Sequence, residues 1–565
     1  MNDRLTVAGP NVPRPAGSDQ GGPRAEGGSE NVSPGPSAVR RPRTRTADPG
    51  RPRGVLVRAV LALSRVEAVR LVRHPALLAG LALAVLPWLY GWATADRYAS
   101  PPVLFNDDRA TQINMMILGA GALIASHLAV LRAPRHGTEA LYQTLAVPRW
   151  SRAAAQLLAA LPVAVLGAVL VTARMLVLTA ASDAAGKPSL TELAAGPVLI
   201  LVLAALGVLL GCLAPGAVVA GPLAVLLLAA VAFVTYLDTS PARWLGPFAA
   251  ENQLTTLPAD LLGRPAGAHL AYLGAVAVLL GALALARVGA PRTALPVAAV
   301  AGALVVLTAL AQLAPASAGL AERRAQATDH PASRQVCERR GTITYCVFPG
   351  FTSWIPDWDE VARGVLRAVP VAARPASLGV RQRVPAASAT SGGTLLQPPP
   401  EDVWRADDAR AGLATTADVG TSWSPSSGVL EFAVNLAYRV TSPGDTAAAD
   451  HRLGDTTELC DARGVVVGWL AAQATAETAY SWQHRLGQSS GGLSVAVPGF
   501  GGGIFLTPRE TAVVSALLEL PAGQVVRRLA AGWAELTAPA TTTERATELL
   551  GVGPPTVPVP AGTAC

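Results

Sequence analysis

The sequence predicts an α-helical polytopic membrane protein with about seven transmembrane helices and a C-terminal extracytoplasmic α+β domain. Composition is the first reason. Hydrophobic residues make up 51% of the 565-residue chain and charged residues only 15%, whereas soluble domains carry about a quarter charged residues. The second reason is a series of long apolar segments in the middle of the chain. The third is the position of the cysteines, four of which fall in the C-terminal region.

Seven segments approach the length of about 20 largely apolar residues that a spanning helix needs. They are Ala76–Trp92, Ile113–Leu131, Ala153–Ala180, Ala195–Leu213, Val218–Leu237, His269–Ala286 and Leu295–Leu313. Soluble core helices do not account for so many such segments in a chain with so little polar surface to cover them. Residues 75–314 are therefore predicted to form the transmembrane domain.

Arginine in the short loops predicts the orientation. The loops after the second and sixth segments are rich in arginine: Arg132, Arg135, Arg149, Arg152, Arg287 and Arg292. The loops after the first and third segments hold more acidic than basic residues. Because loops rich in Lys and Arg stay in the cytoplasm, the N-terminus is expected there. An odd number of spans then places residues 315–565 outside the cytoplasm, in a multi-pass protein of the plasma membrane.

The basic residues are concentrated before the first span. Residues 1–52, mostly Pro, Gly, Ser and Arg, have too little apolar surface to offset the entropy of ordering and are predicted to be a disordered cytoplasmic tail. Residues 53–74 mix apolar side chains with arginines, which is typical of an interfacial amphipathic helix. Residues 1–73 hold 13 Arg and 6 acidic residues, an excess as large as the chain's net charge of +7. This position favours a positive-inside topology signal, with an electrostatic contact to anionic lipid headgroups as the alternative, and argues against nucleic acid.

The cysteines support the same topology. Cys337, Cys346, Cys460 and Cys565 form an even set in the region predicted to be outside, which favours disulfides. Three pairings are possible, and Cys337 with Cys346, closing a short hairpin, leaves Cys460 with Cys565. A zinc site is the alternative, but no CxxC pair is present. Cys212 lies in the fourth segment and is interpreted as a small buried residue.

Residues 315–565 are predicted to fold as an α+β domain. Strand-like runs cover Thr342–Phe348 and Leu430–Thr441, and residues 385–428 are predicted to be a linker or long loops. Helix-like segments cover Asp359–Ala368, Val465–Ala474, Glu510–Leu520, Gly523–Leu536 and Thr543–Leu550.

Two groups of side chains in this domain have alternative interpretations. The aromatic stretch from Tyr345 to Trp358 favours a packed core around the first disulfide, with a ligand-contacting surface as the alternative. An acidic group surrounds Trp404 and is interpreted as a solvated face or an exposed acidic patch. Its members are Glu401, Asp402, Asp407 and Asp408.

Two ionisable residues, His127 and Arg174, lie inside predicted spans. Such residues are candidates for function because ionisable groups are costly in a bilayer. The alternatives are a neutral histidine that is hydrogen-bonded between helices and an arginine whose head reaches the interface. The third segment is long enough to place Arg174 near its outer end, which favours the alternative for this residue.

The loop between the second and third segments has the pattern of a short helix. Thr138 can cap it, and Glu139 lies in its first turn, where a carboxylate is favourable. Its apolar face consists of Leu141, Tyr142 and Leu145. Such a face suits a docking element for a partner, and an ordinary interfacial loop helix has the same pattern.

This loop, with Gly137-Thr138-Glu139 ahead of Leu, Pro and Arg, resembles the first cytoplasmic loop of ABC-2-type transporter permeases. The similarity extends over about residues 55–288. The helix before the first span resembles the family's connecting helix, and the stretch from Trp244 to Leu273 resembles its extracellular re-entrant hairpin and the entry to its sixth span. The seventh span and the C-terminal domain are additions to that family's six spans. The resemblance implies a coupling helix that contacts a separate ATPase subunit, and permease chains that pair as homo- or heterodimers. The coupling residues would be Thr138, Glu139, Leu141, Tyr142 and Leu145.

The sequence lacks common catalytic motifs. It contains no GxxxxGK[ST] phosphate loop and no HExxH, so ATP is expected on a partner subunit, and no cofactor, metal or catalytic residue is assigned to this chain. Residues 487–491 match GxSxG without the apolar strand that a nucleophile elbow needs.

The predicted function is the membrane-spanning permease subunit of an ATP-binding cassette transporter. The alternatives are a membrane-anchored extracytoplasmic enzyme, peptidase-like, and a sensor or scaffold without transport.

Overall fold

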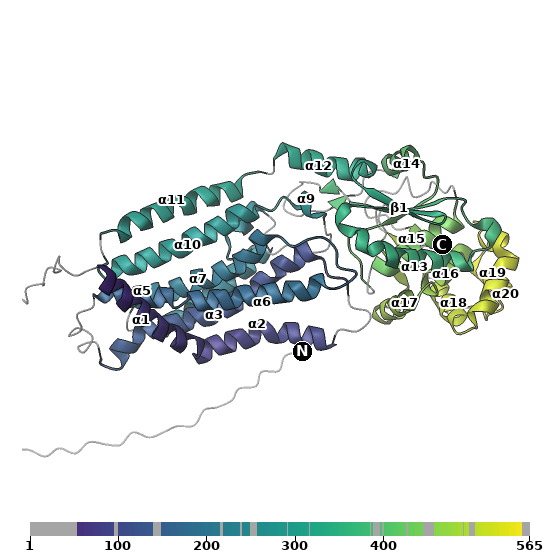
Figure 1. The fold of residues 1–565 in the computed structure, drawn as a ribbon. Helices are drawn as coiled ribbons and strands as arrows, with labels where there is room; N and C mark the ends of the chain where they lie inside the picture. Colours follow the sequence, from purple (N-terminus) through teal and green to yellow (C-terminus); the bar gives the residue numbers. More distant parts are fainter. Residues whose placement is uncertain are drawn as a thin grey trace, which may run out of the picture. The chain divides into compact units, whose positions relative to one another are not determined.

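The computed structural model describes residues 53–565 except for short stretches. These stretches are 95–99, 139–147, 215–217, 238–239, 249–256, 385, 388–395, 398–400, 425–427, 444–456, 490, 497–502 and 558–565, with positions 291, 316 and 556. Most of the described residues are helical, and the β-strands belong to the C-terminal part (Figure 1). The predicted tail, residues 1–52, lies outside the described residues.

Six helical segments of the described chain are long and apolar enough to cross a membrane. They are α2 (Pro75–Thr94), α3 (Leu104–Arg135), α5 with α6 (Arg149–Leu158 and Leu161–Thr179), α7 (Leu190–Leu213), α10 (Ala266–Arg287) and the segment that begins with α11 (Ala294–Leu313). In the place of the predicted fifth span stands α8 (Ala220–Leu237), whose described apolar part, Ala220–Val234, is shorter. The membrane character of the chain is confirmed, and the count of seven remains a prediction.

The long helices lie side by side, and α1 (Arg53–Val72) lies at one end of them (Figure 1). Their outward faces carry exposed apolar side chains, including Leu83 on α2 at 62%, Leu223 on α8 at 64% and Val300 on α11 at 62%. So many exposed apolar side chains on long helices are stable only against lipid or a partner.

The helix α3 is in contact with α2, α6 and α7. Glycines allow two of these contacts to be close. A Cβ on Gly121 would lie 2.5 Å from the Ala76 carbonyl oxygen of α2, and a Cβ on Gly207 of α7 would lie 2.3 Å from the Leu123 carbonyl oxygen. Small residues at helix contacts are typical of packing in membranes. α3 is thus held tightly by its neighbours on both sides.

A four-stranded mixed sheet organises the first half of the C-terminal part. Its order is β1-β2-β3-β6, with β1 antiparallel to β2 and the other neighbours parallel. Gly341, at a φ of 65°, forms the tight turn between β1 and β2, a left-handed conformation that favours glycine. The strands are β1 (Val336–Arg340), β2 (Ile343–Val347), β3 (Leu378–Gln382) and β6 (Thr416–Val419).

Three helices share one hydrophobic core with this sheet. α13 (Ile355–Ala368) connects β2 to β3, as parallel neighbours require. α15 (Gly428–Thr441) and α16 (Ala462–Ala472) are buried along nearly their whole length. The prediction that Leu430–Thr441 forms a strand is therefore wrong. An apolar run that is buried on all sides has no periodicity to separate a strand from a helix.

A smaller sheet, ordered β7-β9-β8, and four helices make up the second half. All five helices predicted in the C-terminal region are present, and Thr342–Phe348 contains β2 as predicted. The elements are β7 (Thr457–Leu459), β8 (Leu493–Val495), β9 (Ile504–Leu506), α17 (Ala476–Gln488), α18 (Pro508–Leu518), α19 (Ala522–Leu536) and α20 (Thr543–Leu550).

Residues 385–428 are not simply a linker, in contrast to the prediction. They contain β6, α14 (Glu401–Arg410) and the short antiparallel pair β4 (Ala386–Ala387) and β5 (Leu396–Gln397). These elements are too short to give a periodic pattern in the sequence. The remaining elements are α9 (Ala259–Leu262), α12 (Ala318–Asp329) and the 3-10 turns η1 (Pro241–Leu245), η2 (Pro331–Ser333), η3 (Pro349–Trp354) and η4 (Val371–Ala373).

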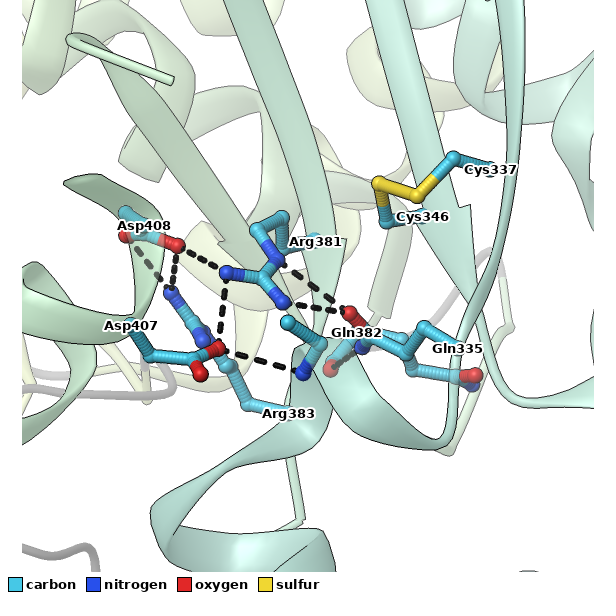
Figure 2. The surroundings of a disulfide bond; sticks show 9 residues. Gln335, Cys337, Cys346, Arg381, Gln382, Arg383, Asp407 and Asp408 are labelled. Atoms are coloured by element: carbon cyan, nitrogen blue, oxygen red, sulfur yellow. Dashed lines mark hydrogen bonds and ion pairs between the residues drawn. A yellow bond between two sulfur atoms is a disulfide. The ribbon is translucent and has the colours of Figure 1, made fainter. Parts of the chain in front are cut away.

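The predicted disulfide between Cys337 and Cys346 is confirmed. The two residues are opposite each other in the β1–β2 register, with their Cα atoms 4.1 Å apart (Figure 2). Cys212 of α7 is a free, half-buried cysteine. Cys460 follows β7, and its predicted partner Cys565 lies outside the described residues, so that pairing remains a prediction.

Candidate functional site

A group of buried polar and charged side chains lies between the apolar helices, and we call it the span cluster. Its members come from α3, α7, α10, α11, η1 and the turn before α10. They are Asp108, Arg109, Gln112, Glu192, Trp244, Arg264, His269 and Gln312. Ionisable groups among apolar helices are costly to bury and mark functional sites by default.

Glu192, in the first turn of α7, receives two partners from α3. The side-chain amide of Gln112 donates to Glu192 Oε2 at 2.7 Å and to the Glu192 carbonyl at 3.1 Å. The Nη1 of Arg109 lies 3.5 Å from Glu192 Oε1. The same guanidinium lies 4.2 Å from the centre of the Trp244 ring, which is a cation–π contact. One arginine is therefore held between a carboxylate and an aromatic face.

Asp108, the neighbour of Arg109 on α3, faces a second arginine. Its Oδ2 accepts the backbone N–H of Ser189 at 2.6 Å, directly before α7. The Nη1 of Arg264 lies 4.0 Å from Asp108 Oδ1. Arg264 also donates to the Phe105 carbonyl and, at 2.9 Å, to Asn106 Oδ1. Arg264 thus joins the start of α3 to the start of α10.

His269 on α10 completes the cluster. Its Nδ1 lies 2.9 Å from Gln312 Oε1 and 3.1 Å from the Trp244 carbonyl. Because both neighbours are acceptors, the proton of the neutral ring belongs on Nδ1. His269 Nε2 is buried and has no hydrogen-bond partner in the described part of the chain. This nitrogen is an available acceptor beside the charged pair.

The length of α3 explains how the chain tolerates these charges. Its 32 residues extend about 48 Å at 1.5 Å per residue, which exceeds a hydrocarbon core of roughly 30 Å. Asp108, Arg109 and Gln112 lie in its first three turns and therefore near one end of the apolar zone. The rest of the helix, from Met115 onward, is apolar enough to span.

The loop between α6 and α7 connects this end of α3 to the C-terminal part. The Leu104 N–H donates to the Ala185 carbonyl at 2.9 Å, and the Gly186 N–H donates to the Gly350 carbonyl at 2.7 Å. The indole N–H of Trp354 donates to the Asp183 carbonyl at 2.9 Å. These hydrogen bonds fix the loop to η3.

Aromatic contacts follow the same route. Phe105 of α3 meets Phe351 edge to face at 6.1 Å, and Phe351 contacts Trp354 at 4.8 Å between ring centres. Trp354 contacts Trp358, and Trp358 contacts Trp423, at 6.4 and 6.1 Å. The rings from Phe351 to Trp358 belong to the stretch predicted to form a packed core, and the structure confirms that they are buried. They link the span cluster to that core.

Acidic groups gather beside this loop. Burial, together with Asp183 and Glu360, raises the pKa of Asp357 to about 6. Burial and the neighbouring Asp357 raise the pKa of Glu477 as well. Among the described residues, no three His, Cys, Asp or Glu side chains gather as a metal site would require. The raised pKa values of Asp357 and Glu477 show that these acids repel one another.

A second charged group, which we call the sheet network, lies in the C-terminal part. It consists of Arg381, Arg383, Asp407, Asp408 and Asp418. The prediction that Asp407, Asp408 and Trp404 form an exposed face is wrong, because all three are buried. Arg381 lies 2.9 Å from Asp407, and Arg383 lies 2.8 Å from Asp408 (Figure 2). Arg383 also lies 2.6 Å from Asp418. The side chains of Glu401 and Asp402 lie outside the described part.

The intramembrane residues singled out in the sequence lie outside the span cluster. His127 is buried in α3 about 22 Å along the helix from Gln112 and packs against Gly221. Arg174 lies over the Trp88 ring at 5.1 Å, near the end of α6. This position agrees with an arginine that reaches the interface.

The predicted coupling helix is described only at its first residue. Thr138 follows the end of α3, and its N–H donates to the Ala133 carbonyl at 3.1 Å. Glu139, Leu141, Tyr142 and Leu145 lie outside the described residues.

The sequence did not reveal the span cluster. Asp108, Arg109 and Glu192 have the pattern of loop charges at the ends of spans, and only the folded chain brings residues about 80 positions apart into contact. One usable signal was present: His269 and Gln312 are polar residues within apolar segments. Comparison with protein-family models, with curated proteins and with solved structures finds no match for this chain.

Proposed function

We propose that the chain is the membrane-spanning permease subunit of an ATP-binding cassette transporter, in which a separate subunit hydrolyses ATP. The observation that carries the proposal is the path of α3. This one helix has the span cluster in its first turns and ends at Arg135, directly before the segment that resembles a coupling helix. A rigid helix transmits a displacement at one end to the other.

The span cluster suggests how movement of α3 could change the packing of the other spans. Its two arginine–carboxylate contacts join α3 to α7 and α3 to the start of α10. A shift of α3 along its axis would change both contacts at once, and such exchange between alternative pairs is a common way to switch helix packing. In the proposed cycle, ATP binding by the partner moves the segment after Thr138, and the cluster rearranges as the substrate passes. The N-terminus and this segment would face the cytoplasm, and the C-terminal part the outside.

Co-purification tests the proposal. We expect the full chain, expressed with its neighbouring reading frames, to recover a stoichiometric ATPase that has a phosphate loop. Leu141→Asp, on the predicted apolar face, should abolish recovery. Gln143→Asp is the matched control, because it adds the same charge to the same segment off that face. Recovery that is lost equally in both variants, or no ATPase with the unmodified chain, would reject the proposal.

A sensor without transport is the second candidate, and the contacts between α3 and the C-terminal part favour it. The Phe105–Phe351 contact and the hydrogen bonds of the α6–α7 loop form a route from the C-terminal core to the span cluster. In a sensor, a ligand of the C-terminal part would change the partner ATPase or kinase without substrate movement. Measuring substrate flux into sealed vesicles separates the two candidates. A permease should produce flux, and a sensor should not.

A further inference from the structure

A cavity lies near the end of α3 that is remote from the span cluster. It has a volume of about 860 Å³ and is lined by residues of α1, α3, α5, α7 and α10. Within the described residues, its charged lining consists of Arg70, Arg132, Arg149, Arg152, Arg287 and Glu67. Five arginines and one glutamate give the lining a net formal charge of +4. Such an excess of like charge in one cavity is a site for an anion.

Glu67 does not neutralise this charge. Its carboxylate is shared between Arg70 of α1, at 3.0 Å, and Arg132 of α3, at 3.1 Å. Arg149 and Arg287 are exposed at the cavity. α5 begins at Arg149 without a side-chain cap, so the positive end of its helix dipole adds to the same field.

The rest of the lining is largely apolar. It includes Leu63, Val66, Ala129, Val130, Ala153 and Cys212. Val66 on α1 is about half exposed, at 50%. A small hydrated anion gains nothing from such walls, whereas an amphipathic anion fits both kinds of surface.

We propose that this cavity binds an anionic phospholipid, with the arginines on its phosphate and the apolar walls against the beginning of its acyl chains. The cavity lies at the ends of helices that are long and apolar enough to cross a membrane, where headgroups are found. Basic pockets between spans on the cytoplasmic side are a known form of lipid recognition, and the arginine-rich loops predict that this end is cytoplasmic. The inference does not depend on ATPase coupling.

The test is a titration of the full chain in detergent with phosphatidylglycerol, phosphatidylcholine or inorganic phosphate. Native mass spectrometry counts bound lipid, and the melting temperature reports binding. We expect phosphatidylglycerol to bind and phosphatidylcholine to bind much more weakly. Arg132→Gln with Arg287→Gln should weaken phosphatidylglycerol binding about 25-fold, at roughly fivefold for each basic residue.

The matched control is Arg135→Gln with Arg292→Gln. It removes the same charge from exposed residues at the same end that do not line the cavity, and its affinity should stay within about twofold of the unmodified chain. Equal weakening in both double variants would reject the site. Binding of inorganic phosphate as tight as that of phosphatidylglycerol would also overturn the proposal, because the ligand would then be a free anion.

A third variant is expected to bind phosphatidylglycerol more tightly, a result that a misfolded protein cannot give. Glu67→Gln removes the one acidic side chain that lines the cavity within the described residues. We expect phosphatidylglycerol to bind about fivefold more tightly to this variant, and phosphatidylcholine to bind as before. Unchanged or weaker phosphatidylglycerol binding would overturn the proposal.

Discussion

The span cluster and the sheet network are both buried and both pair arginines with carboxylates. They differ in the distance between each arginine and its carboxylate. In the sheet network, Arg383 lies 2.8 Å from Asp408 and 2.6 Å from Asp418. In the span cluster, the corresponding separations are 3.5 Å between Arg109 and Glu192 and 4.0 Å between Arg264 and Asp108. Asp108 Oδ1 and Glu192 Oε1 accept no hydrogen bond from the described residues.

The difference separates a structural role from a functional one. A buried network in which each carboxylate has short bonds fixes one arrangement, because every alternative leaves a charge without a partner. Thr416 adds a hydrogen bond of 2.7 Å to Asp408, and the Trp404 ring covers Arg383 at 4.9 Å. In the span cluster, neutral donors hold one oxygen of each carboxylate, at 2.7 Å from Gln112 and 2.6 Å from Ser189. The arginine contacts are longer, and the other oxygens can accept more, so the arginine pairs can exchange at lower cost. We therefore expect the sheet network to control stability and the span cluster to control activity.

The largest expected effect is on the sheet network. Arg383→Met removes the arginine that holds Asp408 and Asp418 and leaves both carboxylates buried. We expect the free energy of unfolding to fall by about 3–5 kcal/mol, measured by urea unfolding of the full chain in detergent, followed by tryptophan fluorescence. Arg410→Met is the control, since Arg410 also bonds an aspartate of the network but its side chain is 55% exposed. It should cost under about 1 kcal/mol, and equal losses would contradict the comparison.

The disulfide beside the sheet network gives the next effect. Residues 337–346 form a short loop, so replacing both cysteines with alanine should lower the free energy of unfolding by about 2–3 kcal/mol. Gln335, just before β1, accepts hydrogen bonds from Arg381 at 2.8 and 3.2 Å (Figure 2). Loss of the disulfide should loosen β1 and weaken this contact. When the cysteine replacements are combined with Gln335→Leu, the total loss in free energy of unfolding should therefore be less than the sum of the two separate losses. Strict additivity would show that the disulfide does not position Gln335.

The span cluster should respond in the opposite way. Glu192→Gln keeps an acceptor for Gln112 but removes the charge that faces Arg109. If the chain is the proposed permease, ATP hydrolysis by its complex with the partner ATPase should fall at least tenfold, or about 1.4 kcal/mol, while the melting temperature falls by only a few degrees. Asp418→Asn in the sheet network is the matched comparison and should lower stability more and the activity of the folded fraction less. A melting temperature that falls as far in Glu192→Gln as in Asp418→Asn would remove the distinction.

The same comparison explains what could be predicted from the sequence. The spans follow from length and apolar composition, and the Cys337–Cys346 hairpin from short spacing, because both signals are local. The sheet network joins residues 25 to 35 positions apart, and acidic residues such as Asp407 have the pattern of a solvated face until their partners are known. In the span cluster, the contacts of α3 with α7 join residues about 80 positions apart, and its contacts with Arg264 join residues up to 159 positions apart. A single sequence contains no signal for that pairing.

The smallest expected effect lies between the two regions, at the acids beside the α6–α7 loop. The pKa of Asp357 is about 6 in the folded chain, above its ordinary 3.8, so between these pH values the folded state binds a proton more tightly than the unfolded state. The free energy of unfolding should therefore fall as pH rises from about 4 to about 6 and then level off. Because Asp357 is partly exposed, we expect a change of about 1 kcal/mol rather than the full value of the shift.

Asp357→Asn should remove this slope and be about 1 kcal/mol more stable than the unmodified chain at pH 7. Urea unfolding at a series of pH values measures both quantities. Glu322→Gln, at an exposed position of α12, is the control and should leave the slope unchanged. If stability instead rises between pH 4 and pH 6 in a way that Asp357→Asn abolishes, the carboxylate is stabilised by the loop rather than repelled by Asp183. Ionisation of the acids would then strengthen the contact of the loop with its neighbours instead of weakening it.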